Sequence, residues 1–481
     1  MRRVGYSKNA VKVALLYPST YQVAMSSAVY HVLYFKLQDE GFYVERFTAD
    51  RGPRGWEDGT PLSHFDYVVA TVHYELDYVN LVKTLIDGGV APESAKRRRP
   101  KIVVGGPPVT ANPEPLAPAA DLEVLGELEA VWKPLVEYLS TGDVVEAPGL
   151  YYPSRGPYPV AIATAKSIND GDFRRLPEPQ AAFSLSVELS RGCPFSCLFC
   201  MESYITKPYR PRDWERAFSE AYSLYNKFGV RPSVVALTAD AHPHFKTFLK
   251  KVVESGLPIS LPSMRADLLD DEAIELMSKL GQRTVTIAPE TSERLRKALG
   301  KDMRDQDVIR VARKAAQLGM RLKIYLMVGL PCEREEDLKE LASLLGEVKK
   351  TGVKMYLSVN PFVPKPQTPL QYHPMETLDA LKTKMRLARS FPHDELSQYD
   401  LNLAAAQAAL GLGGREAFRH IVQAAMAKSP MAYWKKAIKS SELSYIFERR
   451  GEPLPWSHVR GFYTPSQLWE TYTNFLKTAC S

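Results

Sequence analysis

The stretch VELSRGCPFSCLFCMES, residues 187–203, places Cys193, Cys197 and Cys200 in one short loop with the spacing Cys-x3-Cys-x2-Cys. A structural zinc site needs four ligands in two pairs, and no second Cys-x2-Cys or histidine pair follows at that spacing. A disulfide would leave one thiol over. Three thiolates can instead hold three irons of a 4Fe-4S cube, which four thiolates usually hold, and leave the fourth iron open. An open iron can bind a substrate or cofactor, which is a catalytic arrangement.

The chain on both sides of this loop alternates apolar runs with amphipathic stretches. Candidate strands cover residues 183–190, 233–240, 258–267, 283–290, 321–331 and 354–362. Six strands joined by helices favour a partial (β/α)6 barrel of the TIM type, in which the site lies at the carboxyl rim. Polar residues follow these strands at the expected places: Asp240, Arg265, Glu290 and Glu333.

The first part of the chain has a similar rhythm. Residues 11–18, 67–72 and 100–108 are typical of buried strands, and residues 26–41 have helical periodicity closed by a glycine. This alternation predicts an α/β domain with a doubly wound, Rossmann-like parallel sheet. Ligands bind such sheets at the carboxyl ends of the strands. The loops there, YPSTYQVAMSS and GGPPVTANPEP, either admit a flat or bulky ligand or are ordinary turns.

These patterns suggest four segments. We predict a Rossmann-like domain over residues 1–145, a linker with a short hairpin over 146–182, the barrel over 183–395 and a small helical domain over 396–481. The linker assignment rests on its prolines and its lack of long apolar runs.

Composition is that of an ordinary globular protein, with 45% hydrophobic and 24% charged residues among 481. No apolar run approaches the roughly 20 residues of a membrane span, and the first residues do not form a signal peptide, so we expect a cytoplasmic protein. Five cysteines, an odd number with three of them in one cluster, do not describe a disulfide framework. The net charge is +7, and its densest run, AKRRRPK, indicates a solvated loop or a phosphate-binding patch for nucleic acid or anionic lipid.

The loop CPFSCLFC, after a strand and before a helix, resembles the signature of the radical S-adenosylmethionine superfamily. The resemblance implies that the three cysteines ligate a 4Fe-4S cluster and that the amino and carboxylate groups of S-adenosylmethionine chelate its fourth iron. One electron, from a reductant such as ferredoxin or flavodoxin, then cleaves the sulfonium bond and yields methionine and a 5′-deoxyadenosyl radical. Phe199 matches the aromatic position that packs beside the adenine.

Several further motifs, among them PSMRADLL, APETSERLR and YLMVGLPCEREED, are similar to a subfamily with a cobalamin-binding-like domain ahead of the barrel. This resemblance implies that Glu290 and Arg265 lie near S-adenosylmethionine and that Asp240 contacts its amino group. Each has a structural alternative: Glu290 can cap the helix that starts near Ser292, and Arg265 can form a salt bridge at the rim.

The chain also departs from this subfamily. The Asp-x-His-x-x-Gly loop that supplies a histidine ligand to cobalamin is absent, and His31 and His73 lack its neighbours. Cobalamin therefore either binds without a protein histidine or has been lost. No cysteine precedes Cys193, which argues against the methylthiotransferases, because these carry an extra cluster in their first domain.

The remaining cysteines and histidines have competing interpretations. Cys332 either donates hydrogen or holds substrate at the rim, or is a small residue packed in a turn. Cys480 is expected to be frayed and inert. His242 and His244 have a metal-like spacing, but an exposed loop is the favoured interpretation.

We therefore expect a radical S-adenosylmethionine enzyme whose substrate the sequence does not identify. Cobalamin-assisted methylation of an unactivated carbon is the leading hypothesis, followed by a cobalamin-free rearrangement or carbon–carbon bond formation. A different class stays open: an iron–sulfur electron carrier or sensor, in which a fourth protein ligand such as Cys332 would close the cluster.

Overall fold

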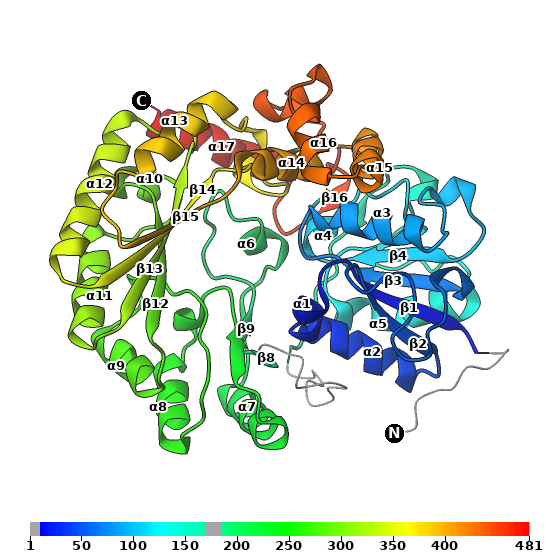
Figure 1. Ribbon diagram of the computed structural model, residues 1–481, viewed down its shortest axis with the longest axis horizontal. Helices are drawn as coiled ribbons and strands as arrows, with labels where there is room; N and C mark the ends of the chain where they lie inside the picture. The colour runs from blue at the N-terminus through cyan, green and yellow to red at the C-terminus, as the bar shows by residue number, and fades with distance from the viewer. Residues whose placement is uncertain (1–9, 169–184, 481) are drawn as a thin grey trace. The chain divides into compact units, whose positions relative to one another are not determined.

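The computed structural model describes residues 10–168 and 185–480, and the chain forms two compact units (Figure 1). The first unit contains the described residues up to 185 together with Ala406–Leu443 and Gly451–Thr464. The second contains Ser186–Ala405, Ser444–Arg450 and residues 465–480. Among the described residues, no helix is long and apolar enough to cross a membrane.

The first unit is built on a six-stranded sheet in the order β2-β1-β3-β4-β5-β6. Its strands are β1 Lys12–Tyr17, β2 Tyr43–Thr48, β3 Tyr67–Thr71, β4 Lys101–Gly105, β5 Leu122–Val124 and β6 Leu150–Tyr151. All pairs are parallel except β5 with β6. The order 2-1-3-4-5 is that of a doubly wound sheet, which reverses direction between β1 and β3. The predicted Rossmann-like topology is thus present.

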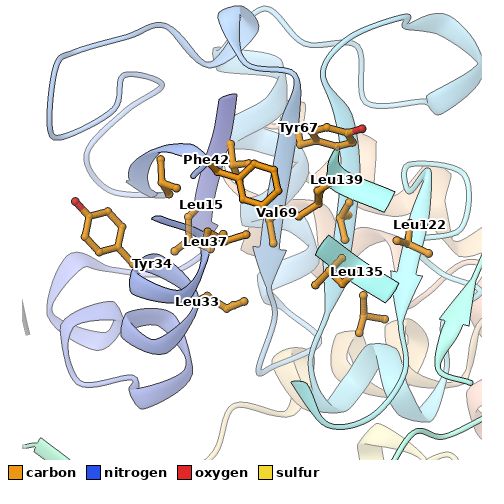
Figure 2. Packing of buried hydrophobic residues seen from close by; sticks show 14 of the residues in the cluster. Leu15, Leu33, Tyr34, Leu37, Phe42, Tyr67, Val69, Leu122, Leu135 and Leu139 are labelled. Atoms are coloured by element: carbon orange, nitrogen blue, oxygen red, sulfur yellow. The ribbon is translucent and has the colours of Figure 1, made fainter. Parts of the chain in front are cut away.

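Helices cover both faces of this sheet. They are α1 Tyr21–Met25, α2 Ala28–Asp39, α3 Asp77–Asp87, α4 Pro107–Ala111 and α5 Leu128–Thr141. Helices α2 and α5 lie on one face and α3 on the other (Figure 1). Figure 2 shows the core under α2 and α5, where Leu33 and Leu37 of α2 and Leu135 of α5 meet Leu15 and Val69 of the sheet. Burial of these side chains away from water holds the layers together.

Strand β2 was not predicted, because its sequence YVERFT carries two charges. Both charged residues are buried and paired: Tyr43 donates to Glu45 at 2.5 Å, and Arg46 lies 2.6 Å from Glu57. Buried charges are tolerated when they are paired and hydrogen-bonded. The apolar pattern that marks a strand is therefore interrupted here although the strand is buried.

In the described part of the predicted linker, the short strands do not form a hairpin with each other. Strand β6 pairs with β5, whereas β7 Val160–Ala161 pairs with β16 Val459–Arg460. The short strands of this region thus find partners far away in the sequence. The rest of the predicted linker, residues 169–184, lies outside the described residues.

The residues after 395 do not form a compact unit of their own, which differs from the predicted helical domain. Their elements are β15 Glu395–Gln398, α14 Leu401–Leu412, α15 Phe418–Met426, α16 Pro430–Ala437 and α17 Pro465–Ala479. The segment around α14 and α15 packs in the first unit. Asn112 donates to the carbonyls of Gly411 and Gly413, at 2.8 and 2.9 Å, and Arg415 pairs with buried Glu114 at 2.7 Å.

The second unit carries β12 Thr284–Glu290, β13 Arg321–Val328, β14 Lys354–Pro361 and β15 as a parallel sheet, next to a pair formed by β8 Leu185–Glu188 and β11 Pro232–Val235. Five of the six predicted strands are confirmed. Residues 258–267 form only isolated bridges, Ser233 with Ser260 and Met264 with Ile287. Pro258 and Pro262 lack the N–H groups that a continuous ladder needs.

Helices line the outer side of this sheet. They are α7 Trp214–Phe228, α8 Phe245–Ser255, α9 Asp271–Lys279, α10 Glu293–Ala298, α11 Asp305–Gln317, α12 Glu335–Lys350 and α13 Leu378–Ala388. The short helix α6 Glu202–Ile205, which follows the cysteine loop, lies on the opposite side of β12–β14 from α11 and α12 (Figure 1). The sheet therefore separates a helical layer from the cysteine loop.

The end of the chain is attached to the second unit. Cys332 and Cys480 form a disulfide, and Arg294 donates to the carbonyls of both Ala479 and Cys332. The expectation that Cys480 is frayed and inert is wrong, as is the expectation of no disulfide. The pairing joins residues 148 positions apart, so the sequence spacing gave no sign of it.

Candidate functional site

The cysteine loop runs from β9 Ser190–Arg191 to helix α6. Cys193 and Cys197 are buried, Cys200 is partly buried, and all three are free thiols. The Cys193 sulfur lies 3.3 Å from the hydroxyl oxygen of Thr238, which follows β11. The loop thus brings three unpaired thiols beside the strands of the second unit, as the sequence predicted.

Contacts from other segments fix the course of the loop. The ammonium group of Lys207 donates to the carbonyls of Cys193 and Phe195, at 2.7 and 3.0 Å. Gly192 has a φ of 76°, and a Cβ there would lie 2.6 Å from the carbonyl oxygen of Thr206. Only glycine permits both this backbone conformation and this close approach.

The electrostatics at Cys197 combine burial with positive charge. Burial raises the pKa of the Cys197 thiol, and the charges of Lys301 and Arg265 act in the opposite direction. Burial also raises the pKa of Cys200, to about 11. Metal binding requires the thiolate form, so a bound cluster would displace these protons.

The three thiols fit a cluster better than a single ion. Within residues 10–168 and 185–480, no three His, Cys, Asp or Glu side chains are grouped so as to hold one metal ion. A 4Fe-4S cube binds each thiolate to a different iron, so its ligands need not converge on one point. Three free thiols in one fixed loop, with two cations nearby, are a suitable donor set for three of its irons.

Asp240 lies in the short turn after β11, beside Arg265. Its Oδ2 accepts the backbone N–H of Arg265 at 2.7 Å, whereas its Oδ1 is buried and has no hydrogen-bond partner. Burial raises the pKa of Asp240 to about 7. A buried oxygen without a partner is costly, and an ammonium donor at this point would relieve that cost.

The guanidinium of Arg265 already has two partners. It pairs with Asp267 at 2.9 Å and lies over the ring of Phe195, 3.8 Å from the ring centroid. The salt-bridge alternative for Arg265 is therefore realised in the structure. The stacking of Arg265 on Phe195 also connects the segment around Met264, which bridges to Ile287 of β12, to the cysteine loop.

Glu290 ends β12 in a left-handed conformation, with a φ of 68°. Its carboxylate accepts from Lys301 at 2.9 Å, and Lys301 is one of the charges that act on Cys197. Ser292, not Glu290, caps helix α10, because its hydroxyl accepts the N–H of Leu295. The capping alternative for Glu290 is therefore wrong. Its carboxylate is linked to the cysteine loop by Lys301, whose charge acts on Cys197.

The remaining predicted residues have different outcomes. Phe199 is partly buried in the cysteine loop, and its role beside an adenine stays a prediction. His242 is buried, and both ring nitrogens are in use: Nε2 with the carbonyl of Arg212 and Nδ1 with the N–H of His244. The expected exposed loop is wrong for His242, and a histidine metal pair is equally excluded.

Sequence reasoning missed Lys207, Lys301 and Phe195. Lys207 and Lys301 contact the predicted site from other segments, and Phe195 lies inside the cysteine loop, where its ring stacks under Arg265. The available signal was weak: Lys301 follows a glycine at the end of α10, close behind the predicted Glu290.

In the first unit, the carboxyl ends of β1 and β3 form a second candidate site. The ring of Tyr17, at the end of β1, stacks on that of exposed His73, with 5.4 Å between centroids. Thr71 lies 3.0 Å from Nε2 of His73. This is the point where the strand order reverses, at which doubly wound sheets bind their ligands.

The chain matches two family models, one described as radical SAM proteins, N-terminal, over residues 45–146, and one described as the radical SAM superfamily, over residues 187–345. It is 30% identical over 386 residues to an uncharacterized protein of Methanocaldococcus jannaschii, covering 77% of this chain and 82% of the relative. It is 28% identical to an uncharacterized methyltransferase of Pyrococcus horikoshii, over 50% of this chain and 56% of that protein.

Two solved structures share the fold at low sequence identity. The radical S-adenosylmethionine methyltransferase TsrM from Kitasatospora setae, with cobalamin and a [4Fe-4S] cluster bound, has a TM-score of 0.58 at 15% identity over 98% of this chain and 89% of its own. The cobalamin-dependent enzyme OxsB has a TM-score of 0.57 at 14% identity, over 98% and 80%.

With this fold, the three-cysteine loop and a relative matched over most of its length, the chain belongs to the radical SAM superfamily. It is a radical SAM enzyme. Membership implies a 4Fe-4S cluster and S-adenosylmethionine as cofactors.

Proposed function

We propose that this enzyme is a cobalamin-dependent methyltransferase that uses radical chemistry. The observation that carries the proposal is the presence of two candidate sites in one chain: the cysteine loop in the second unit, and the stacked rings of Tyr17 and His73 at the switch point of the first. The likeness to TsrM and OxsB over 98% of this chain supports it, as does the relative named as a methyltransferase.

The cluster would be held by Cys193, Cys197 and Cys200. When bound, it supplies the electron that cleaves the sulfonium bond of S-adenosylmethionine. Lys207 holds the loop carbonyls in place, and Gly192 lets the segment around Thr206 pack against the loop.

Asp240 and Glu290 would bind S-adenosylmethionine. The unpartnered Oδ1 of Asp240 can accept from its amino group, which agrees with the role that the sequence suggested. Glu290 can accept from ribose hydroxyls while Lys301 keeps its carboxylate oriented. Lys301 and the carboxylates of Asp240 and Glu290 would together orient the cofactor, and they do not themselves react.

Cobalamin would bind at the carboxyl ends of β1 and β3. When bound, it supplies a carrier for the methyl group. The edge fits a flat cofactor, because the stacked rings of Tyr17 and His73 stand at the switch point and Val23 of α1 exposes an apolar side chain next along the chain. Beyond helix α4, Asn112 donates to Gly411 and Glu114 pairs with Arg415.

The experiment is anaerobic reconstitution of the cluster, with and without cobalamin, followed by reduction, addition of S-adenosylmethionine and assay of 5′-deoxyadenosine and S-adenosylhomocysteine. We expect stoichiometric cobalamin binding, and S-adenosylhomocysteine only when cobalamin is present. Cys197→Ser should lose both products, whereas Cys332→Ser, outside the loop, should keep them. S-adenosylhomocysteine formation that does not depend on cobalamin would contradict the proposal.

An electron carrier or sensor is less well supported. A carrier would need a fourth protein ligand, for which the sequence suggested Cys332. The Cys332 sulfur is bonded to Cys480 in this structure and is not a free thiolate. The fourth iron would therefore be left for a cofactor.

A further inference from the structure

The strands of the second unit have one face that the helices do not cover. In β13, Leu322, Ile324, Leu326 and Val328 are fully buried, whereas the alternate residues are partly exposed. The same alternation continues in β12 and β14. Because successive side chains of a strand point to opposite faces, the partly exposed residues share one face of the sheet. We call this face, which comprises Thr286, Lys323, Tyr325, Met327, Tyr356, Ser358 and Asn360, the inner face.

The inner face carries one lysine held between two aromatic rings. The ammonium of Lys323 lies 4.8 Å from the ring centroid of Tyr325 and 5.0 Å from that of Tyr356. Within the part of the chain that the structure describes, no carboxylate forms a salt bridge with Lys323. A partly buried ammonium without an acidic partner is costly to the extent that it is desolvated. The two rings offset part of that cost through cation–π attraction.

Lys323 also lines a cavity of about 280 Å³ at the amino ends of the same strands. The other lining residues are Thr284, Arg321, Lys354, Met355, Tyr356, Asp394 and Glu395. Three cations thus face two carboxylates, and Asp394 is already paired with Lys349 at 2.5 Å. The balance of charge in the cavity is therefore positive, which favours an anionic guest.

The inner face leads from this cavity toward the carboxyl ends of the strands and the cysteine loop. A register shift in β12 between Ile287 and Glu290 places Glu290 beside Leu326, toward the carboxyl end of β13, and Glu290 connects through Lys301 to Cys197. Four residues of strand separate Lys323 from Met327 near the carboxyl end of β13, a span of roughly 13 Å. A group bound at Lys323 would therefore belong to a substrate long enough to reach the carboxyl ends of the strands.

We propose that Lys323, between Tyr325 and Tyr356, binds an anionic group of the substrate, a carboxylate or a phosphate monoester. The proposal rests on the proposed function only in that this substrate is the one that the enzyme methylates. The substrate would lie along the inner face with its anionic end at Lys323 and its reacting carbon roughly 13 Å away, at the carboxyl ends of the strands. Ser358 and Asn360 supply hydroxyl and amide groups along that path.

The test uses the reconstituted holoenzyme and three small probes that differ in one group: 3-phenylpropionate, phenyl phosphate and the neutral 3-phenylpropionamide. Ligands of this size are expected to bind with dissociation constants of about 1 mM, which saturation-transfer NMR measures. The variants are Lys323→Met and Lys323→Arg. Lys382→Met serves as the matched control, because Lys382 is exposed on α13, does not line the cavity, and loses the same charge on replacement.

We expect at least one acid to bind, with the amide at least tenfold weaker. Lys323→Met should weaken acid binding at least tenfold, Lys323→Arg should retain most of it, and Lys382→Met should change it less than about twofold, since its charge is exposed and lies outside the cavity. Preference for the phosphate or for the carboxylate identifies which anion the site takes. Equal binding of acid and amide, equal losses in both methionine variants, or no binding of either acid would overturn the proposal.

The same samples separate this inference from the proposed function. Cluster absorbance, cobalamin content and S-adenosylhomocysteine formation are measured beside the probe titrations. If these three readouts are intact and binding of the acids does not depend on Lys323, the anion site is refuted and the proposed methyltransferase stands. If the acids bind through Lys323 but cobalamin does not bind, the anion site stands and the proposed reaction is refuted.

Discussion

Replacing Asp240 with asparagine should change how the stability of the second unit depends on pH. Burial raises the pKa of Asp240 to about 7 from its ordinary 3.8. Between these two values the folded protein keeps a proton that the unfolded chain releases, so the free energy of unfolding falls as pH rises. Above about pH 7 both states are ionised, and the destabilisation is complete.

The size of this effect follows from the two pKa values. Between about pH 5.5 and pH 8.5, titration of Asp240 should lower the free energy of unfolding by about 2 kcal/mol. For units of this size, 1 kcal/mol corresponds to a shift of about 2–4 °C in melting temperature, so about 4–8 °C is expected. Asparagine does not titrate, so the variant lacks this pH-dependent part of the free energy of unfolding. The cost of its buried amide, about 1–3 kcal/mol, is the same at every pH.

The assay is thermal unfolding of wild type and Asp240→Asn at both pH values, without S-adenosylmethionine. The difference in melting temperature, wild type minus variant, should fall by about 4–8 °C as pH rises. Asp302→Asn, at an exposed position, controls for the loss of a carboxylate and should show no such change. A wild-type minus Asp240→Asn difference that stays constant with pH would refute the account of a buried, strained carboxyl group.

Three further predictions concern stability and cluster loading. Gly192→Ala should load less cluster, because its Cβ would lie 2.6 Å from the carbonyl of Thr206, and iron content with absorbance at the cluster band measures the loss. Reduction of the Cys332–Cys480 disulfide should lower the melting temperature of wild type but not of the Cys332→Ser/Cys480→Ser variant, since a loop closed over 148 residues is worth up to about 5 kcal/mol. Arg415→Leu should destabilise the first unit by about 1–3 kcal/mol, because it leaves buried Glu114 without its cation, and a Glu114→Gln/Arg415→Leu double variant should recover part of that loss in chemical denaturation.

Much of the fold was predictable from the alternation of apolar residues. The strands at 11–18, 67–72, 283–290, 321–331 and 354–362 were found because each contains a buried apolar run. Strand β2 was missed because Glu45 and Arg46 interrupt that run, and their pairing with Tyr43 and Glu57 is tertiary. Residues 258–267 were overpredicted because apolar content outweighed two prolines.

The site was predictable only in part. The cysteine spacing carries its own chemistry, so Cys193, Cys197 and Cys200 could be proposed from sequence. Lys207 and Lys301 could not, because they reach the loop from segments that the fold brings together. The disulfide of Cys332 with Cys480 was missed for the same reason. Lys323 was visible as one of two charged residues, with Arg321, in an alternating strand, RLKIYLMV, but was not singled out.

The central claim is that three cysteines hold a cluster whose fourth iron is open to S-adenosylmethionine. The most direct measurement is the electron paramagnetic resonance spectrum of the reduced, reconstituted enzyme, with and without S-adenosylmethionine labelled with ¹⁵N at its amino group. We expect the spectrum to change on addition and the label to appear as a hyperfine coupling to the cluster, and Cys197→Ser to show no cluster signal. A loaded cluster whose spectrum is the same with and without S-adenosylmethionine would contradict the claim.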